Sequence, residues 1–271
     1  MQLIFLGTAA SEGYPGIFCN CGRCRQARRE GGRNIRFRSS ILVNDDLLID
    51  FGPDLQASAL KFGHSLWGIT TGLVTHAHSD HFYTGNFGMR GDAFTSELPP
   101  PTLHLFGPKD VSSILAKTFP DLTAIHLESN TVHAFDTWPS DGYTITAFQA
   151  FHAIDSLEAL FYSVEDGEHA ILYATDTGSF PLDTRQALTG RSFDVIVLEE
   201  TMGDGNYNQH LGFETFLEQV QWIRSEGILR PGGRLIAQHF SHSGNPLHDE
   251  LEKILNPHEV EVAYDGLTIE L

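Results

Sequence analysis

Short apolar segments recur along the chain and alternate with amphipathic ones almost to its end. Many apolar segments are continuous, such as DVIVLEE at 194–200 and AILYATD at 170–176, which is typical of strands covered on both faces. The pattern predicts strands over 2–6, 40–43, 47–50, 72–75, 102–106, 143–148, 160–164, 170–174, 195–199 and 234–238. It predicts helices over 82–89, 111–118, 183–189, 215–226 and 247–255, and a turn at the PGG of 231–233.

This alternation predicts an α/β architecture of two mixed sheets packed together, with helices outside. No repeat, low-complexity linker or change of composition divides the 271 residues, so we expect one domain over 1–271. The first seven residues, MQLIFLG, lack a basic leader and fit a strand better than a signal peptide. No apolar run approaches the ~20 residues needed to cross a bilayer. We therefore expect a cytoplasmic protein without a membrane partner.

The amino-acid composition limits the classes of molecule that the protein is expected to bind. The formal net charge of −18 argues against a nucleic-acid partner, because binding a phosphate backbone relies on clustered Lys and Arg. Basic residues do gather between 23 and 38, where they form either a solvated face or a contact for one anionic group. Fourteen histidines against three cysteines is an unusual ratio, and it points to metal binding.

The strongest chemical signal is TGLVTHAHSDHF at 71–82. An apolar run precedes a polar cluster in which His76 and His78 suit one borderline metal such as Zn²⁺. Asp80 and His81 follow where the next helix is predicted to begin, and they can turn toward a second metal. Four ligand-type residues within six positions would be costly as an unliganded structural feature.

The HAHSDH segment resembles the HxHxDH signature of the metallo-β-lactamase fold, a four-layer αββα sandwich of hydrolases. The rest of that family's pattern appears in order along nearly the whole chain: Asp50 in LLIDFG, His152 in FQAFHAI, Asp176 in LYATDTG and His239 in LIAQHFSH. The resemblance implies one metal on His76, His78 and His152. It implies a second metal on Asp80, His81 and His239, with Asp176 shared and Asp50 supporting the metal loop. Asp80 thereby also counts among the catalytic residues.

Such a dinuclear centre binds Zn²⁺, Mn²⁺ or Fe²⁺, and the sequence does not choose among them. Two metals ~3.5–4 Å apart can bind a bridging hydroxide and polarise a substrate oxygen, and the resemblance implies that this hydroxide would be the nucleophile. The fold hosts several chemistries, so the reaction must come from further residues.

Two such residues are Glu199 in VLEET and His210 in YNQHLGFET. They resemble the acidic residue and histidine of the phosphodiesterase branches, including the tRNA 3′-processing endonucleases. There, a histidine held by a carboxylate protonates an alkoxide leaving group, which implies a general-acid role for His210. The alternatives are that His210 only begins a helix and that Glu199 only anchors a loop.

All three cysteines lie in GIFCNCGRCRQ at 16–26. This segment, together with QHFSH at 238–242, resembles the phosphodiesterase of the carbon–phosphorus lyase pathway, which opens a cyclic phosphate on a phosphoribose. The resemblance implies a structural Zn²⁺ bound by Cys19, Cys21, Cys24 and His242. A disulfide with one thiol left over, or a redox pair, are the alternatives.

Arg90 in FGMRG is also similar to phosphodiesterase relatives and could hold a substrate phosphate through its planar fork, although a surface arginine is an equal alternative. Two departures limit the resemblance. Only 23 residues separate His152 from Asp176, which leaves little room for the insertion that grips tRNA. Glu199-Glu200-Thr201 stands where the carbon–phosphorus lyase enzyme is expected to carry Asp-Cys-Ser.

We therefore expect a dinuclear phosphodiesterase acting on a small, nucleotide- or sugar-like phosphodiester, either linear or cyclic. One alternative is hydrolysis of a thioester, lactone or lactam on the same metals. Another is a non-hydrolytic accessory protein related to pyrroloquinoline quinone biosynthesis, whose early cysteine cluster is similar. Because relatives are commonly dimers, a homodimer is among the expectations.

Overall fold

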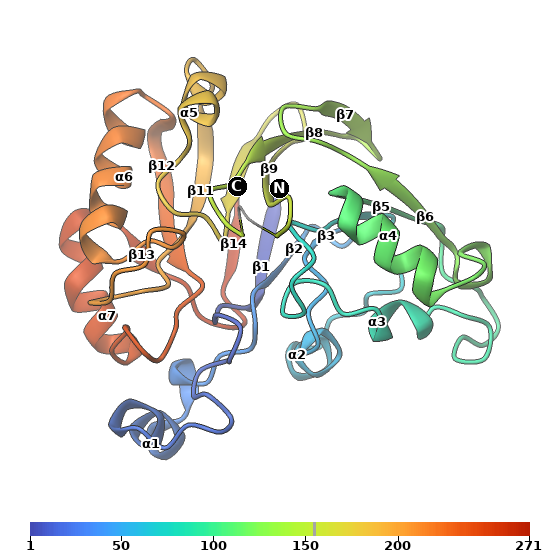
Figure 1. Ribbon diagram of the computed structural model, residues 1–271, viewed down its shortest axis with the longest axis horizontal. Helices are drawn as coiled ribbons and strands as arrows, with labels where there is room; N and C mark the ends of the chain where they lie inside the picture. The colour runs from blue at the N-terminus through green and yellow to red at the C-terminus, as the bar shows by residue number, and fades with distance from the viewer. Residues whose placement is uncertain (154–155) are drawn as a thin grey trace.

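The computed structural model describes residues 1–153 and 156–271, which form two seven-stranded sheets (Figure 1). In spatial order the first sheet contains β14 (Thr268–Glu270), β1 (Gln2–Gly7), β2 (Ser40–Val43), β3 (Leu47–Ile49), β4 (Thr71–Leu73), β5 (Leu103–Gly107) and β6 (Leu127–Thr131). The second contains β13 (Glu261–Val262), β12 (Leu229–Gln238), β11 (Phe193–Glu199), β10 (Ala170–Ala174), β9 (Leu160–Glu165), β8 (Tyr143–Gln149) and β7 (Thr137–Ser140).

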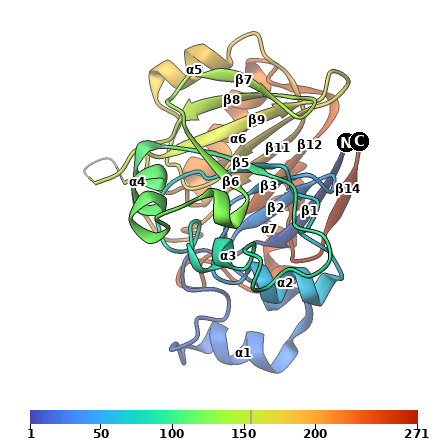
Figure 2. The same cartoon turned by 90° about the vertical axis from the view of Figure 1, so that its right-hand side faces the viewer.

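Both sheets are mixed, as the sequence predicts. Strands β3 to β6 run parallel, and so do β10 to β13, whereas the remaining neighbours pair antiparallel. The amino- and carboxyl-terminal strands β1 and β14 pair in one sheet, so the two ends of the chain lie side by side (Figures 1 and 2).

Helices cover the outer faces of the sheets. They are α1 (Gly22–Glu30), α2 (Leu55–Phe62), α3 (Gly85–Gly88), α4 (Lys109–Thr118), α5 (Leu182–Leu188), α6 (Phe213–Ser225) and α7 (His248–Leu255), with short 3₁₀ turns at 32–34, 123–125 and 256–258. Helices α2, α3 and α4 lie against the first sheet, and α5, α6 and α7 against the second, while α1 projects from one end (Figures 1 and 2). Among the described residues, no helix has the length and apolarity needed to span a bilayer.

Three apolar layers hold this arrangement together. The middle layer lies between the sheets and joins residues such as Leu3 and Ile41 of the first sheet to Tyr162 and Val195 of the second. The outer layers bury the apolar faces of the helices, and burial of such side chains contributes about 1.5–3 kcal/mol each. Helix, sheet, sheet and helix therefore follow one another, which confirms the expected four-layer order.

Some elements differ from the prediction. The pattern misses β6, β7, β13, β14, α1 and α2. Helix α1 escapes detection because it is strongly basic and buries only Cys24 and Ala27. The expected helix over 82–89 is reduced to the single turn of α3. The expected turn at 231–233 is wrong, since these residues form a bulge inside β12, where the pairing shifts from Leu229 to Arg234.

Candidate metal centre and active site

The predicted site residues converge at the carboxyl ends of strands from both sheets. Asp50 follows β3, residues 75–81 follow β4, and His152, Asp176 and His239 follow β8, β10 and β12. Asp50, Asp176 and His239 have positive φ angles of 66°, 49° and 64°. Residues other than glycine adopt this conformation rarely, and such positions cluster at functional sites. A sharp backbone turn at three strand ends thus brings side chains from distant segments together.

His76, His78 and His152 form the first ligand group. Nε2 of His76 lies 2.9 Å from Nδ1 of His78, and Nε2 of His152 lies 3.2 Å from the same atom. Burial lowers the pKa of His76 and of His152, so both rings favour the neutral form that binds metals.

Asp80, His81, Asp176 and His239 form the second group. Nε2 of His81 lies 2.6 Å from Oδ2 of Asp176 and 3.2 Å from Oδ2 of Asp80, and Nε2 of His239 lies 3.0 Å from Oδ1 of Asp176. Oδ2 of Asp176 is also 3.3 Å from Nε2 of His76. Asp176 therefore contacts both groups, in the position where a shared carboxylate would lie.

The unpaired atoms of these residues fit a metal centre. His81 Nε2, His239 Nε2 and Asp176 Oδ1 are buried, and none has a partner in hydrogen-bonding geometry despite the short separations. Burying polar atoms without partners is costly, and a divalent cation among them would remove that cost. Imidazole nitrogens with carboxylate oxygens suit Zn²⁺, Mn²⁺ or Fe²⁺.

Neighbouring side chains orient His76 and His81 through hydrogen bonds at Nδ1 of each ring. Nδ1–H of His81 donates to Oδ2 of Asp50 at 2.6 Å, and Nδ1–H of His76 donates to Oγ1 of Thr75 at 3.0 Å. Asp50 in turn accepts from the backbone N–H of Thr75 at 2.8 Å. Fixing Nδ1 leaves Nε2 of each ring toward the centre, which is how such partners tune metal ligands. Asp50 thus contacts the metal loop as the sequence comparison implies.

Glu199, at the end of β11, connects His210 with the second ligand group. Nδ1–H of His210 donates to Oε1 of Glu199 at 2.9 Å. The hydroxyl of Thr201 donates to Oε2 of Glu199 and accepts from Nδ1–H of His239 at 2.8 Å. The backbone N–H of Thr177 also donates to Glu199, at 2.7 Å. One fully buried carboxylate therefore orients both His210 and, through Thr201, the ring of His239.

His210 is poised to carry a proton. Burial lowers its pKa, but the carboxylates of Glu199 and Asp176 outweigh that effect and raise the pKa to about 9. Because Nδ1 is engaged by Glu199, the second proton resides on Nε2. The ring borders two cavities, one of about 390 Å³ over the ligand groups and one of about 890 Å³ beside it.

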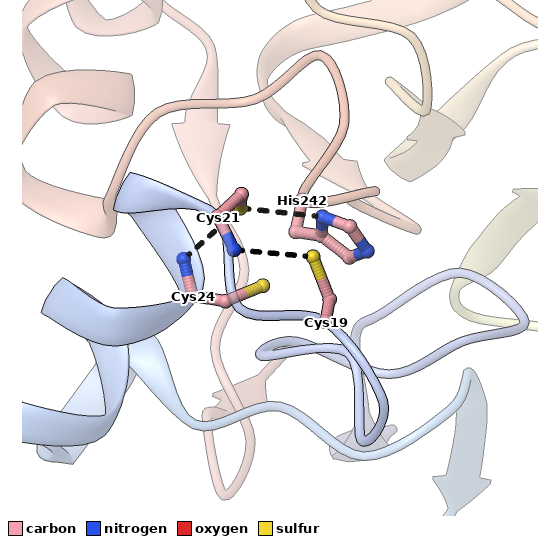
Figure 3. Close-up of side chains that lie close together, drawn as sticks. All are labelled: Cys19, Cys21, Cys24 and His242. Atoms are coloured by element: carbon pink, nitrogen blue, oxygen red, sulfur yellow. Dashed lines mark hydrogen bonds between the residues drawn. The ribbon is translucent and has the colours of Figure 1, made fainter.

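The three cysteines meet His242 at a separate place (Figure 3). Sγ of Cys21 lies 3.9 Å from Nδ1 of His242, and all four ligand atoms lie within 4.8 Å of one another. Hydrogen bonds from the backbone N–H of Cys24 lower the pKa of Cys21 to about 6, whereas burial raises the pKa of Cys24 to about 12. None of the three thiols is in a disulfide, and three sulfurs with one imidazole match a tetrahedral Zn²⁺ site.

Arg90 does not join the site. Its guanidinium donates to the carbonyls of Pro101, Ile125 and His126, and it lines an apolar cavity between α2 and α3. With its donors engaged there, Arg90 is not placed to contact a phosphate held at the histidine groups. The sequence could not reveal this, because the carbonyls lie 11, 35 and 36 residues from Arg90 and meet it only in the folded chain.

Several residues at the site escape the sequence analysis. Thr201 lies two residues after Glu199 in VLEET, but nothing in that segment indicates that its hydroxyl contacts both Glu199 and His239. Tyr207 stacks near His210, with ring centroids 5.9 Å apart. Glu12 and Ser241 also line the smaller cavity. Glu12 belongs to no recognisable motif, and Ser241 lies inside QHFSH without being one of its two histidines.

Residues 46–240 match the model of a family described as the beta-lactamase superfamily domain. This match covers more than half of the chain. The chain belongs to this family. Both histidine groups lie inside the matched segment, whereas the cysteines and His242 lie outside it. The family fits the metallo-β-lactamase fold expected from the sequence and supports a metal-dependent hydrolase.

Two curated proteins are similar in sequence to this chain. An octanoyltransferase of Porphyromonas gingivalis is 36% identical over 85 residues, which are 30% of this chain and only 16% of that protein. The coenzyme PQQ synthesis protein B of Cupriavidus necator is 27% identical over an alignment of 311 positions that covers 98% of each chain.

Solved structures share the fold over the whole chain. A diphosphatase from the PhnP family has a TM-score of 0.78 at 23% identity, covering 100% of this chain and 97% of the other. Zinc-bound PqqB from Methylobacterium extorquens has a TM-score of 0.75 at 21% identity, covering 100% of both chains. The short form of human tRNase Z has a TM-score of 0.71 at 19% identity, covering 100% and 99%.

Proposed function

We propose that this protein is a dinuclear metal-dependent phosphodiesterase acting on a small, linear or cyclic phosphodiester. In this proposal residues 1–271 act as one domain, which the pairing of β1 with β14 supports. His76, His78 and His152 hold one metal, Asp80, His81 and His239 hold the other, and Asp176 is shared. When bound, the two metals supply a water-derived nucleophile at neutral pH and polarise a phosphoryl oxygen.

The contact between His210 and Glu199 is the observation that carries the proposal. A phosphodiester with an alkoxide leaving group needs a proton on the departing oxygen, and proton donation of this kind contributes about 10²–10⁴-fold. His210 has Nδ1 fixed by Glu199 at 2.9 Å and borders the cavity over the metal groups. Glu199 stabilises the protonated ring and holds its orientation, so Nε2–H is the proton that reaches the leaving oxygen.

The surrounding residues keep this arrangement in place. Glu199 accepts from Thr177 and Thr201 as well as from His210, so its carboxylate has little freedom to turn away. The backbone N–H of Ala153 donates to Oε1 of Gln209 at 2.6 Å, which ties the segment carrying His210 to the loop carrying His152. The proton donor and the first ligand group therefore keep a constant spacing.

We also propose a structural Zn²⁺ on Cys19, Cys21, Cys24 and His242. It would join the segment after β1 to the segment after β12, only three residues from His239. The site shares no ligand with the two histidine groups, so its proposed role is to stabilise these two segments.

A second candidate function has specific support. The full-length similarity to a coenzyme PQQ synthesis protein favours a role in cofactor synthesis that needs no phosphodiester. Hydrolysis of a thioester, lactone or lactam on the same metals likewise needs no proton donor at His210.

One experiment separates these functions. Metal-free protein is reconstituted with Zn²⁺ or Mn²⁺, and cyclic and linear phosphodiesters are compared with a thioester, a lactone and a β-lactam. The proposal expects phosphodiester turnover and three metals per chain by inductively coupled plasma mass spectrometry. Turnover confined to the acyl substrates, or a count of one metal per chain, would refute it.

A further inference from the structure

The cavity over the metal groups has a wall that the proposed chemistry does not use. Glu12, Ser241 and Ser243 line this cavity, and we call them the glutamate–serine wall. The larger cavity shares His210 and Tyr207 with the smaller one, but the glutamate–serine wall does not border it. A phosphodiester at the metals therefore has two different surroundings for its two organic groups.

Hydrogen bonds within the glutamate–serine wall all donate toward Glu12. The hydroxyl of Ser241 donates to Oε1 of Glu12 at 2.5 Å. Because that hydroxyl has a single hydrogen, the 2.7 Å contact between Ser241 and Ser243 has Ser243 as its donor. The chain of donors ends on the Glu12 carboxylate, whose Oε2 receives no donor from the described residues. An unused carboxylate oxygen at a cavity over a metal centre is an acceptor for a ligand.

The wall is linked to the segment that carries His239. The backbone N–H of Ala10 donates to the carbonyl of Phe240 at 3.1 Å, joining the segment of Glu12 to the residue after His239. Nε2 of His242 lies 3.7 Å from Oε1 of Glu12, while Nδ1 of the same ring faces Cys21. The proposed structural site therefore lies next to Glu12.

The charged side chains that line the two cavities also limit which substrates can bind. Among the described residues that line the two cavities there is no Lys or Arg, whereas Glu12, Asp204 and Glu214 do line them. Apart from the protonated ring of His210, which borders both cavities, a second phosphate on the substrate would meet acidic groups and no Lys or Arg. Arg23 donates to the carbonyl of Ser243 at 3.0 Å, and this positive charge next to the wall disfavours an ammonium group there.

From this geometry we infer that Glu12 is a specificity-determining residue that accepts a hydrogen bond from a hydroxyl of the substrate. The substrate is then a phosphodiester whose retained organic group is a neutral polyol, such as a sugar or glycerol, with no second phosphate. The leaving group lies on the opposite side, at His210 and the larger cavity. This inference rests on the proposed function, because it concerns the same site.

A matched pair of substrates tests it. Glyceryl p-nitrophenyl phosphate and propyl p-nitrophenyl phosphate differ only in two hydroxyls. We expect the wild-type protein to favour the glyceryl ester about tenfold or more in kcat/KM, mainly through KM, since hydrogen bonds to charged groups are the strong ones. Glu12→Gln should reduce this preference to about threefold or less, because it removes the charge while keeping the size of the side chain. Glu214→Gln, the same change at the larger cavity, should keep the preference.

Binding measured without turnover keeps the two proposals apart. Isothermal titration calorimetry with glycerol 3-phosphate and propyl phosphate should show the same preference in the metal-loaded wild type and its loss in Glu12→Gln, with three metals retained. Equal affinity for both phosphates in the wild type would overturn the inference, as would an unchanged preference in Glu12→Gln. A stronger preference for the 2-aminoethyl ester would show that the wall binds an ammonium group instead. If the glyceryl preference in binding persists but neither ester is hydrolysed, the proposed phosphodiesterase function is wrong, whereas the inference about Glu12 is upheld.

Discussion

Replacing His210 by Asn tests the proton donor while preserving its support. The Asn amide can occupy the place of Nδ1–H and donate to Glu199, but it has no counterpart of the Nε2 proton. His210→Ala is less suitable alone, because Glu199 would keep only the donors from Thr177 and Thr201. Losing one hydrogen bond to a buried carboxylate costs about 1–3 kcal/mol of stability, which could be mistaken for a catalytic effect.

The expected loss depends on the leaving group. For a diester with an alkoxide leaving group, His210→Asn should lower kcat by about 10²–10⁴-fold, the usual contribution of general acid catalysis. That loss corresponds to about 3–5 kcal/mol in the activation barrier. For a p-nitrophenyl ester the loss should stay below about tenfold, because p-nitrophenolate departs without protonation.

The assay compares kcat for methyl and p-nitrophenyl esters of the same phosphate, together with metal content and melting temperature. His133→Asn is the matched control, since His133 also faces a carboxylate, Oε2 of Glu158 at 3.3 Å, but outside the site. Equal losses for both leaving groups would refute the general-acid role. Loss of a metal from His210→Asn would instead make His210 a ligand, which its position beside His239 allows.

Three further changes have defined outcomes. Cys21→Ser should remove one Zn²⁺ per chain and lower the melting temperature, and a full metal count would contradict the structural site. Asp176→Asn should weaken binding of both catalytic metals in a metal titration while the cysteine-bound Zn²⁺ stays. Burial and the charge of Arg36 lower the pKa of His248 to about 4 in the folded protein. Its contribution to the free energy of unfolding is therefore complete above about pH 6.5 and is lost as the pH falls toward 4. His248→Gln should therefore flatten the fall in unfolding free energy over this range, by up to about 1.4 kcal/mol per pH unit in urea titrations.

The local motifs of the sequence were sufficient to predict the family. Two histidines of the metal-ligand type and the following Asp-His stand within six positions after a strand, so their candidate chemistry can be recognised without knowing the fold. The continuous apolar runs predict the buried strands of both sheets for the same reason, since burial on both faces leaves a purely local signature. The elements that escaped prediction are those with little buried apolar surface, such as α1 and the short strands β13 and β14.

Only the tertiary structure decided which distant residues meet. Arg90 resembles a phosphate ligand in the sequence, but the fold pairs it with three carbonyls. Glu12 belongs to no motif, yet it lines the cavity over the two ligand groups. Thr201 is only the last residue of VLEET, yet its hydroxyl links Glu199 to His239. A candidate ligand residue can be recognised from its own chemistry and its near neighbours in the sequence. Its neighbours come from other strand ends, whose approach depends on sheet pairing and packing across the whole chain.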